Sequence, residues 1–262
     1  MPMLSATIVV LVEDTPVPGT GLRWDKGLSF WIETPDGVGL FDAGPSEVSV
    51  ENARALGLDL SRVDWVVLSH EHHDHAGGLP KLLEACGEGV RVFAHPAAFG
   101  PKLVREEDGE LRDHGCGCRI EDLEALGAQV ECHRRPAEVQ PGILALGEIP
   151  RKTQFETVPD RFVTRTADGE AVHDGMPDDQ ALALLTDRGA AVLLGCAHAG
   201  VVNTVMRVRE LTEGEHIHAL IGGMHLQEAE AESTHRAVEC LRVFGVECVG
   251  AGHCTGEGAY RA

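Results

Sequence analysis

The chain is short of basic residues, aromatic residues and long apolar runs. It has 22 Lys and Arg against 42 Asp and Glu, a net charge of -20. Because no Lys/Arg cluster offsets this charge, binding to nucleic acid or another polyanion is disfavoured. No apolar stretch approaches the roughly 18 residues of a membrane helix, and the first residues lack the basic start of a secretion signal. We therefore expect a cytoplasmic protein with neither a membrane nor a nucleic-acid partner.

The cysteines also exclude one class of protein. Eight of them are scattered over 262 residues without the paired spacing of a disulfide framework, which suits a reducing compartment. Cys116-Gly117-Cys118 is the one close pair, and it is either a redox or metal site or an incidental pair in a polar loop. The length favours one large domain over two small ones.

The densest group of metal-capable side chains lies in the stretch LSHEHHDHAGG. It places His70, His72, Asp74 and His75 directly after an apolar run, 63–68, that predicts a buried strand. Side chains alternate along an extended segment, so His70 and His72 point to the same side. The turn that follows brings the other two to a second position. Imidazoles and carboxylates are the ligands that a zinc-like divalent ion prefers.

Later in the chain, three apolar strands each end in small residues and a histidine. The strands are predicted at about 190–194, 217–221 and 246–250, and the histidines are His198, His225 and His253. Because the ends of neighbouring strands meet at one edge of a sheet, these histidines should lie together. The metal loop is expected at the same edge.

The remaining pattern predicts an α/β fold. Other strands are expected at about 6–12, 28–33, 38–41, 63–69, 90–94 and 181–186, and helices at about 47–56, 79–85, 201–211 and 228–244. Two sheets with helices outside, an αββα sandwich, is the layered arrangement that this order supports. The segment 101–179 is charged and rich in Gly and Pro, with only short strands. We expect it to be an insertion that covers the substrate within a single domain spanning 1–262.

The metal loop, an upstream aspartate in LFDAG and the downstream histidines together resemble the metallo-β-lactamase superfamily. The segments GLSFWIET, GEIPR, DDQAL, GCAHAGVVNT, IGGMHL and GHCTG are similar to its branch of 7,8-dihydropterin-6-methyl-4-(β-D-ribofuranosyl)aminobenzene-5'-phosphate synthase-like proteins, over about 27–256. This resemblance implies the αββα sandwich and a metal-dependent enzyme. It also implies that Asp42 orients the metal loop from behind the ligands. In the branch, Glu-His-Gly stands where this chain has Asp25-Lys26-Gly27.

The resemblance further implies two metal sites. Their ligands would be His70, His72 and a residue near 178 or 198 around one ion, and Asp74, His75 and His253 around the other. Zinc is the preferred ion, bound as one or two ions. Iron is less expected because diiron members carry a carboxylate at the position of His72, and manganese stays open.

Two positions depart from the superfamily pattern. The histidine expected upstream of the strand that carries the bridging ligand is missing, and Asp178, Asp179 or His173 could replace it. At the bridging position itself, Cys196 or His198 stands in place of the usual aspartate. His198 is preferred because Cys196 lies close to the apolar strand and fits a buried small side chain.

The chemistry that follows is hydrolysis of a small phosphorylated or carboxylated substrate, pterin-related ones included. A water shared by two divalent ions loses a proton near neutral pH and becomes a nucleophile. Asp74 and His225 are the candidate catalytic groups, with His225 alternatively a ligand. Arg151 is the candidate anion contact because a guanidinium fits a phosphate or carboxylate. Glu148 and His95 complete the candidate substrate-binding set, although Glu148 could equally form a surface ion pair with Arg151.

Two other functions stay open. A condensing enzyme, which the branch name implies, would need an aromatic-lined pocket. With 7 Phe, 3 Trp and 1 Tyr, the candidates for its walls are Trp24, Trp31, Phe99, Phe155 and Phe162. A non-catalytic metal or redox sensor would depend on Cys196, Cys254 and the Cys116/Cys118 pair. The sequence is compatible with a homo-oligomer.

Overall fold

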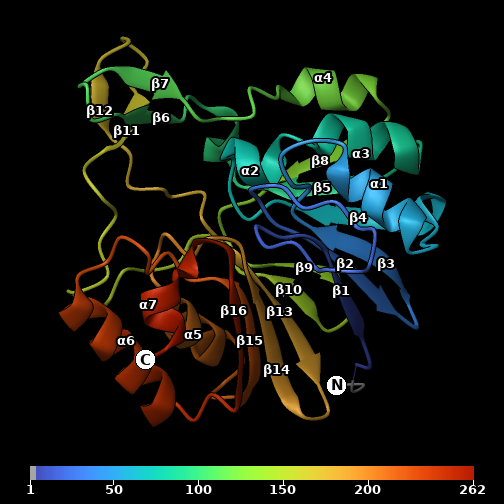
Figure 1. The fold of residues 1–262 in the computed structure, drawn as a ribbon. Coiled ribbons are helices and arrows are strands. Elements are labelled where there is room, and N and C mark those ends of the chain that lie inside the picture. The colour runs from blue at the N-terminus through green and yellow to red at the C-terminus, as the bar shows by residue number, and fades with distance from the viewer. Residues whose placement is uncertain (1–3) are drawn as a thin grey trace.

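The fold is a sandwich of two six-stranded sheets with helices on both outer faces (Figure 1). The structure, a computed structural model, describes residues 4–262. The predicted αββα sandwich is confirmed. None of the helices among the described residues combines the length and the apolar character that crossing a membrane requires.

The first sheet comes from the N-terminal half of the chain. In spatial order its strands are β1 (Thr7–Val12), β2 (Ser29–Thr34), β3 (Gly37–Phe41), β4 (Val63–Val67), β5 (Arg91–Ala94) and β8 (Gln129–Cys132). The first three strands form an antiparallel meander, and the others run parallel to β3. Its outer face is covered by α1 (Val48–Ala55), α3 (Leu79–Cys86) and α4 (Ile120–Ala125). In α3, Leu79, Leu82, Leu83 and Cys86 are buried at helical spacing, which explains why this segment packs as a helix.

The second sheet comes mainly from the C-terminal half. In spatial order its strands are β16 (Cys248–Gly252), β15 (Ile217–Gly223), β14 (Gly189–Leu194), β13 (Ala181–Thr186), β10 (Ile143–Ala145) and β9 (Ala137–Gln140). The strands β14, β15 and β16 are parallel, so their carboxyl ends lie at the same edge. The helices α5 (Val201–Leu211) and α6 (Ala231–Val243) connect them and cover the outer face. Two short helices, α2 (His73–Ala76) and α7 (Glu257–Tyr260), complete the fold.

The layer between the two sheets holds most of the large buried aromatic side chains. Phe30, Phe41, Trp65 and Phe93 of the first sheet pack there against aliphatic side chains of the second. Burying such a side chain contributes about 1.5–3 kcal/mol, so this layer is a main source of stability. Gly39 lies under the Trp65 ring, where any Cβ would overlap the indole. This packing fixes the position of the strand ends that carry the polar side chains.

The segment 101–179 has two different parts. Four short strands, β6 (Leu103–Arg105), β7 (Leu111–Asp113), β11 (Phe162–Arg165) and β12 (Ala171–His173), form a separate sheet in the order β12-β11-β6-β7, which projects above the sandwich in Figure 1. By contrast, α4, β8, β9 and β10 extend the main layers. Only the outlying strands therefore stand apart as an addition to the sandwich.

Candidate metal centre

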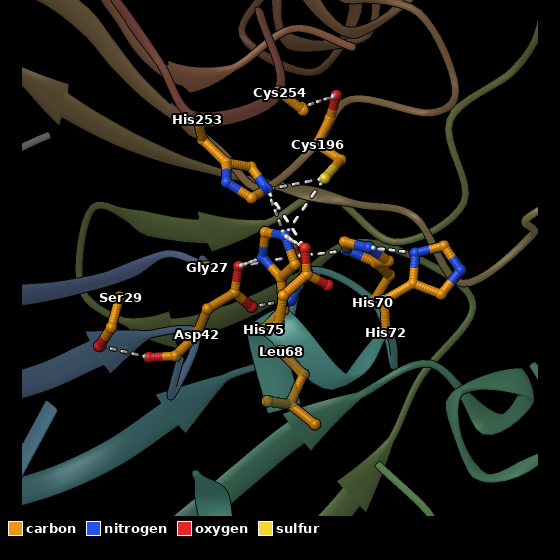
Figure 2. A network of polar contacts seen from close by, with 12 residues as sticks. Gly27, Ser29, Asp42, Leu68, His70, His72, His75, Cys196, His253 and Cys254 are labelled. Atoms are coloured by element: carbon orange, nitrogen blue, oxygen red, sulfur yellow. Dashed lines mark hydrogen bonds and ion pairs between the residues drawn. The ribbon is translucent and has the colours of Figure 1, made fainter. Parts of the chain in front are cut away.

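The candidate metal centre lies at the edge where strand ends of both sheets meet. Asp42 follows β3, and the metal loop begins at His70 after β4. Cys196, His225 and His253 follow β14, β15 and β16. In Figure 2 the side chains of the metal loop face Cys196 and His253 across the sandwich. Segments far apart in the sequence thus contribute to one cluster.

The backbone at this edge is unusually constrained. Asp42, Ala197, His225 and His253 have positive φ angles of 62°, 55°, 48° and 48°, a conformation that non-glycine residues rarely adopt. Such residues cost of order 1–3 kcal/mol each and gather at functional sites. Each turn comes directly at or after a strand end, and it aims the following side chains into the cluster. Gly195 allows the two sheets to approach, because a Cβ there would overlap Ser69 Oγ.

One group of imidazoles combines His70, His72 and His198. His70 Nε2 lies 3.0 Å from His72 Nδ1, and the His198 ring centroid lies 4.8 Å from that of His70 and 5.0 Å from that of His72. Burial, together with the neighbouring imidazoles, lowers the pKa of His70 and His198 well below its ordinary value. These rings are therefore neutral, as metal ligands must be.

The second group combines His75, Cys196 and His253. His75 Nε2 lies 3.2 Å from Cys196 Sγ and 3.1 Å from His253 Nε2, which in turn lies 3.4 Å from the same sulfur. Asp74 Oδ2 borders the group, 3.5 Å from His253 Nε2 and 3.9 Å from His75 Nε2. Two nitrogen ligands of a tetrahedral zinc ion stand roughly 3.3 Å apart, given bond lengths of about 2.0–2.1 Å. The observed separations fit ligands of one ion.

Counting protons gives the same result. His75 Nδ1 bonds to Asp42 at 2.7 Å and His253 Nδ1 bonds to Asp14 at 2.8 Å, so in the neutral form of each ring, which metal binding requires, the proton lies on Nδ1. Both Nε2 atoms then offer a lone pair to one cation across the 3.1 Å that separates them. In addition, both ring nitrogens of His198 are buried without a hydrogen-bond partner. One cation between the two Nε2 lone pairs, and a second at the unprotonated nitrogen of His198, would give these lone pairs a partner, so the residues fit one or two metal ions.

Asp42 supports the ligands from behind. Its fully buried carboxylate accepts hydrogen bonds from the Ser69 backbone N–H and hydroxyl, each at 2.7 Å, and from His75 Nδ1. Burial lowers the pKa of His75, but the negative charges of Asp42 and Asp74 outweigh it and raise the pKa to about 9. The same negative field attracts a divalent cation. Figure 2 shows the Asp42 carboxylate beside the His75 ring.

Sequence reasoning missed a second pair of supporting carboxylates. Glu13 and Asp14 follow β1. Glu13 accepts the backbone N–H of His253 at 2.7 Å, and Asp14 accepts the His253 ring N–H at 2.8 Å. The sequence did contain a signal for this pair. Two adjacent carboxylates directly after an apolar strand that ends at this edge are expected to face a cation or a hydrogen-bond donor.

The Cys116/Cys118 pair lies behind the metal loop, outside the two imidazole groups. Gly117 N–H donates to Glu71 Oε1 at 3.1 Å, and His73 N–H donates to the His114 carbonyl at 2.7 Å. Burial raises the pKa of Glu71 to about 7. The loop around 114–118 therefore braces the backbone of the metal loop.

The acidic residues proposed for the missing histidine have other partners. Asp178 binds Lys102 Nζ at 2.5 Å and accepts the Glu71 N–H at 3.2 Å. Asp179 accepts the Ala199 N–H at 2.9 Å, and burial raises its pKa to about 6. His173 is exposed on β12 of the outlying sheet. His198 stands beside His70 and His72, and Cys196 lies between both groups. Cys196 and His198, which the sequence left as alternatives for one position, therefore both reach the cluster.

A cavity of about 620 Å³ opens beside the cluster. Its lining includes metal-group residues and several cationic or aromatic side chains, among them His72, Asp74, Cys196, His198, His253, Lys26, His73, His114, Arg161, Phe162 and His225. The His225 ring lies 4.3 Å from that of His198, between centroids, and both its nitrogens are free of protein partners. The cavity therefore offers an imidazole and two cationic side chains, Lys26 and Arg161, next to the candidate metal positions, and Arg161 is paired with Glu228 at 2.6 Å.

The residues predicted to bind substrate lie outside this lining. Arg151 donates to the backbone carbonyls of His198 at 2.8 Å and Met176 at 3.2 Å, and also to that of Gly175. These bonds give Arg151 a structural role in joining two loops, which corrects the predicted contact with an anion.

His95 and Glu148 also belong to a separate contact. His95 Nε2 lies 2.9 Å from Glu148 Oε1, which also binds Arg134 at 2.7 Å. His95 is buried and its Nδ1 accepts the Ala97 N–H. Arg161, ten residues after Arg151 in the same segment between β10 and β11, lines the cavity instead.

Comparison with known proteins identifies the family. Residues 22–200 match the metallo-β-lactamase superfamily. The chain belongs to this superfamily. It is 32% identical, over 95% of its length and 87% of the relative, to the 7,8-dihydropterin-6-methyl-4-(β-D-ribofuranosyl)-aminobenzene-5'-phosphate synthase of Methanocaldococcus jannaschii. It is 28% identical, over 88% of its length and 84% of the relative, to an uncharacterized protein of the same organism.

A solved metallo-β-lactamase-superfamily structure matches nearly the whole chain. Tm1679, described as a metal-dependent hydrolase of the β-lactamase superfamily, superposes with a TM-score of 0.82 at 30% identity, over 97% of this chain and 90% of that one. The predicted superfamily, and the branch resemblance, are thereby confirmed.

Proposed function

We propose that this protein is a metal-dependent hydrolase acting on a small anionic substrate in the 620 Å³ cavity. The observation that carries the proposal is the convergence of His75, Cys196 and His253, at 3.1–3.4 Å, beside that cavity, which Cys196 and His253 line. Zinc suits these ligands best, because imidazole and thiolate together are typical of zinc sites. When bound, divalent ions would supply Lewis acidity and lower the pKa of a water molecule.

The protein's own residues orient the reaction. Asp42 and Asp14 fix the ring tautomers of His75 and His253, so that both Nε2 lone pairs point into the centre. Asp74 lines the cavity. Burial raises its pKa, but the adjacent His75 and His253 outweigh this and lower it. Asp74 is therefore ionised and able to accept a proton or to bind a cation.

His225 is the proposed proton donor to the leaving group. It lines the cavity, and neither ring nitrogen has a protein partner that would hold its proton. Its backbone N–H donates to Cys254 Sγ at 3.3 Å, which with its positive φ of 48° sets the direction of the ring. A general acid must reach its target within hydrogen-bond distance, and a free imidazole on the cavity wall meets that requirement.

The substrate's negative charge would face Arg161 and Lys26. Arg161 lies over the Phe162 ring, 5.0 Å from its centroid. Its Nη2 pairs with Glu228 at 2.6 Å, whereas its Nε is buried without a partner. Phe162 is itself surrounded by the rings of His72, His198 and His225. A cavity with two cationic side chains, one aromatic wall and the candidate metal positions fits a phosphorylated or carboxylated ring compound.

A second candidate is a condensing enzyme that joins a pterin-like and a phosphorylated aromatic substrate. Two observations favour it: the relative at 32% identity is named as a synthase of that kind, and Phe162 supplies an aromatic wall. Of the other predicted aromatic candidates, Trp31 is fully buried, and Trp24, Phe99 and Phe155 are absent from the lining. The aromatic surface is therefore small for two stacked rings, which favours hydrolysis.

The test is turnover by the zinc-loaded protein. We expect hydrolysis of at least one member of a panel of aryl phosphodiesters, phosphomonoesters, lactones and thioesters, and its loss in His253→Ala. Exposed His235, far from the cavity lining on α6, provides the control variant His235→Gln. If the zinc-saturated protein turns over no member of the panel but joins a dihydropterin to an aminobenzene riboside phosphate, the second candidate replaces the first.

A further inference from the structure

A second group of metal-capable side chains lies at the opposite end of β15 from the candidate metal centre. His216 and His218 flank Ile217 at the start of this strand, and Glu247 lies just before the neighbouring strand β16. One ring nitrogen of each histidine and one carboxylate oxygen of Glu247 lie within 4.8 Å of one another. We call these three residues the distal cluster. β15 is seven residues long, so at roughly 3.3 Å per residue the two groups are about 20 Å apart.

The backbone fixes the geometry of the distal cluster. Side chains two residues apart on a strand point to the same side, which brings His216 and His218 together. Glu247 is held beside them because its N–H donates to the Ile217 carbonyl at 3.2 Å. These contacts come from paired strands, so the ligand positions are set by the sheet rather than by a mobile loop.

The distances fit a metal ion. His218 Nδ1 lies 2.8 Å from Glu247 Oε2, and His216 Nε2 lies 3.2 Å from Glu247 Oε1. Two tetrahedral ligands at bond lengths of about 2.0–2.2 Å stand roughly 3.3–3.5 Å apart. The two Glu247 separations differ from this range by about 0.1–0.7 Å, and the two imidazole nitrogens lie within 4.8 Å of each other, so a small adjustment of the side chains brings all three to one ion. The side chains are 42%, 19% and 53% exposed, in the order 216, 218 and 247, which leaves the remaining positions open to water.

We propose that His216, His218 and Glu247 form a second metal-binding site that takes zinc or a similar divalent transition-metal ion. Two imidazoles with one carboxylate favour zinc, nickel or copper over magnesium and calcium, which prefer oxygen ligands alone. The net charge of -20 raises the local concentration of cations at the surface. Nothing in the proposal depends on which reaction the cavity performs.

The ion would act as a clamp on an edge strand. β16 lies at the edge of its sheet, and Cys248, Val249 and Gly250 are exposed. The same strand delivers His253 to the candidate metal centre at its other end. Because an ion that binds only the folded chain stabilises it by mass action, zinc at the distal cluster should raise the melting temperature and hold β16 against β15.

Metal content measured on matched variants tests the proposal. The wild-type protein, the double variant His216→Gln/His218→Gln and the control His235→Gln would be dialysed to equilibrium against the same buffered zinc chloride. His235 is a suitable control because it pairs with Glu239 at 3.4 Å on exposed α6 but has no second histidine beside it. We expect the wild-type and control proteins to retain one zinc equivalent more than the double variant. Their melting temperatures should also rise further with zinc.

Glu247→Gln provides an independent measurement, because an exposed single change of this kind leaves the fold intact. We expect it to weaken binding of the additional zinc about 10-fold or more, since a charged ligand is lost. Equal zinc content in the wild-type, double-variant and control proteins would overturn the proposal. So would unchanged affinity in Glu247→Gln. Either result would leave the proposed function untouched, because the cavity residues are the same in all of these variants.

Discussion

The two ends of β15 both hold imidazoles and carboxylates, but in opposite surroundings. At the end beside the cavity, His198 is 5% exposed and neither of its ring nitrogens has a hydrogen-bond partner. At the other end, the side chain of His216 is 42% exposed and its Nε2 is bonded to Glu247. The two groups contain similar types of ligand. Their surroundings differ in burial, in backbone strain and in the number of ring nitrogens that lack a hydrogen-bond partner.

This difference separates the proposed reactive site from the proposed stabilising one. A buried centre excludes water, so charges inside it act at low dielectric, and a left-handed backbone such as that of His225 fixes each side chain. An exposed cluster keeps its ion hydrated and has no enclosed space for a substrate. Burial, rather than the identity of the ligands, is what suits one end of the strand for catalysis.

Removing a buried ligand should have the largest effect. His75→Ala deletes a side chain that contacts Cys196 and His253 at 3.2 and 3.1 Å, so we expect loss of one zinc equivalent. Turnover should fall by more than about 100-fold, because changes behind the ligands alone cost 10–100-fold. The measurement is zinc content together with hydrolysis of the best substrate of the panel, with circular dichroism to verify folding. Full zinc content and full turnover in His75→Ala would contradict the account, and His235→Gln serves as the control.

Asp42→Asn should have the next largest effect, about 10–100-fold weaker zinc binding. An asparagine amide next to His75 Nδ1 would move the ring proton to Nε2, where it points at the metal position. Zinc affinity measured by competition with a chelator tests this expectation. Asp187→Asn, in the exposed turn between β13 and β14, provides the matched control. Equal affinity in Asp42→Asn and Asp187→Asn would show that the carboxylate does not orient the ring.

Asp179→Asn should stabilise the zinc-free protein, more so at higher pH. Burial raises the pKa of Asp179 to about 6 from 3.8, so the folded state disfavours its ionisation. The free energy of unfolding of the wild-type protein therefore begins to fall as the pH rises above 3.8. The loss is complete above about 6, where it reaches at most about 3 kcal/mol. Melting temperatures of the variant and wild type at pH 4.5 and 7.5 measure this. An advantage of Asn that is equal at both pH values, or larger at the lower one, would contradict the assignment.

Arg161→Gln should have the smallest of these effects, an increase in KM of about tenfold, or about 1.4 kcal/mol, with little change in kcat. The reason is that its guanidinium lines the cavity over the Phe162 ring and is not among the candidate metal ligands. Arg165→Gln is the control, because Arg165 lies exposed at the end of β11, the strand that begins directly after Arg161. An unchanged KM in Arg161→Gln would remove this residue from the substrate site.

Much of the sandwich could be predicted from the sequence because its strands are strongly apolar. β13 and β14 are buried along almost their whole length, and their predicted bounds agree with the structure to within one residue. The metal loop could be found because four ligand candidates lie within a few residues of each other. Likewise, the three strand ends with histidines could be aligned because parallel strands share one edge.

The remaining features depend on tertiary contacts that leave little trace in the sequence. The strands of the outlying sheet are three or four residues long and half-exposed, so no clear alternation marks them. Nothing local distinguishes Arg151, which binds backbone carbonyls, from Arg161, which lines the cavity. The two arginines differ in role because of the way the segment between β10 and β13 folds back over the strand ends, which is a tertiary feature.

The most direct test is an anomalous difference map at the zinc absorption edge from crystals grown with zinc chloride. The account predicts density among His70, His72 and His198, and between His75 and His253 beside Asp74 and Cys196, with Cys196 Sγ within bonding distance of an ion. Anomalous peaks confined to the surface, with none within a side chain's reach of His75 and His253, would contradict it.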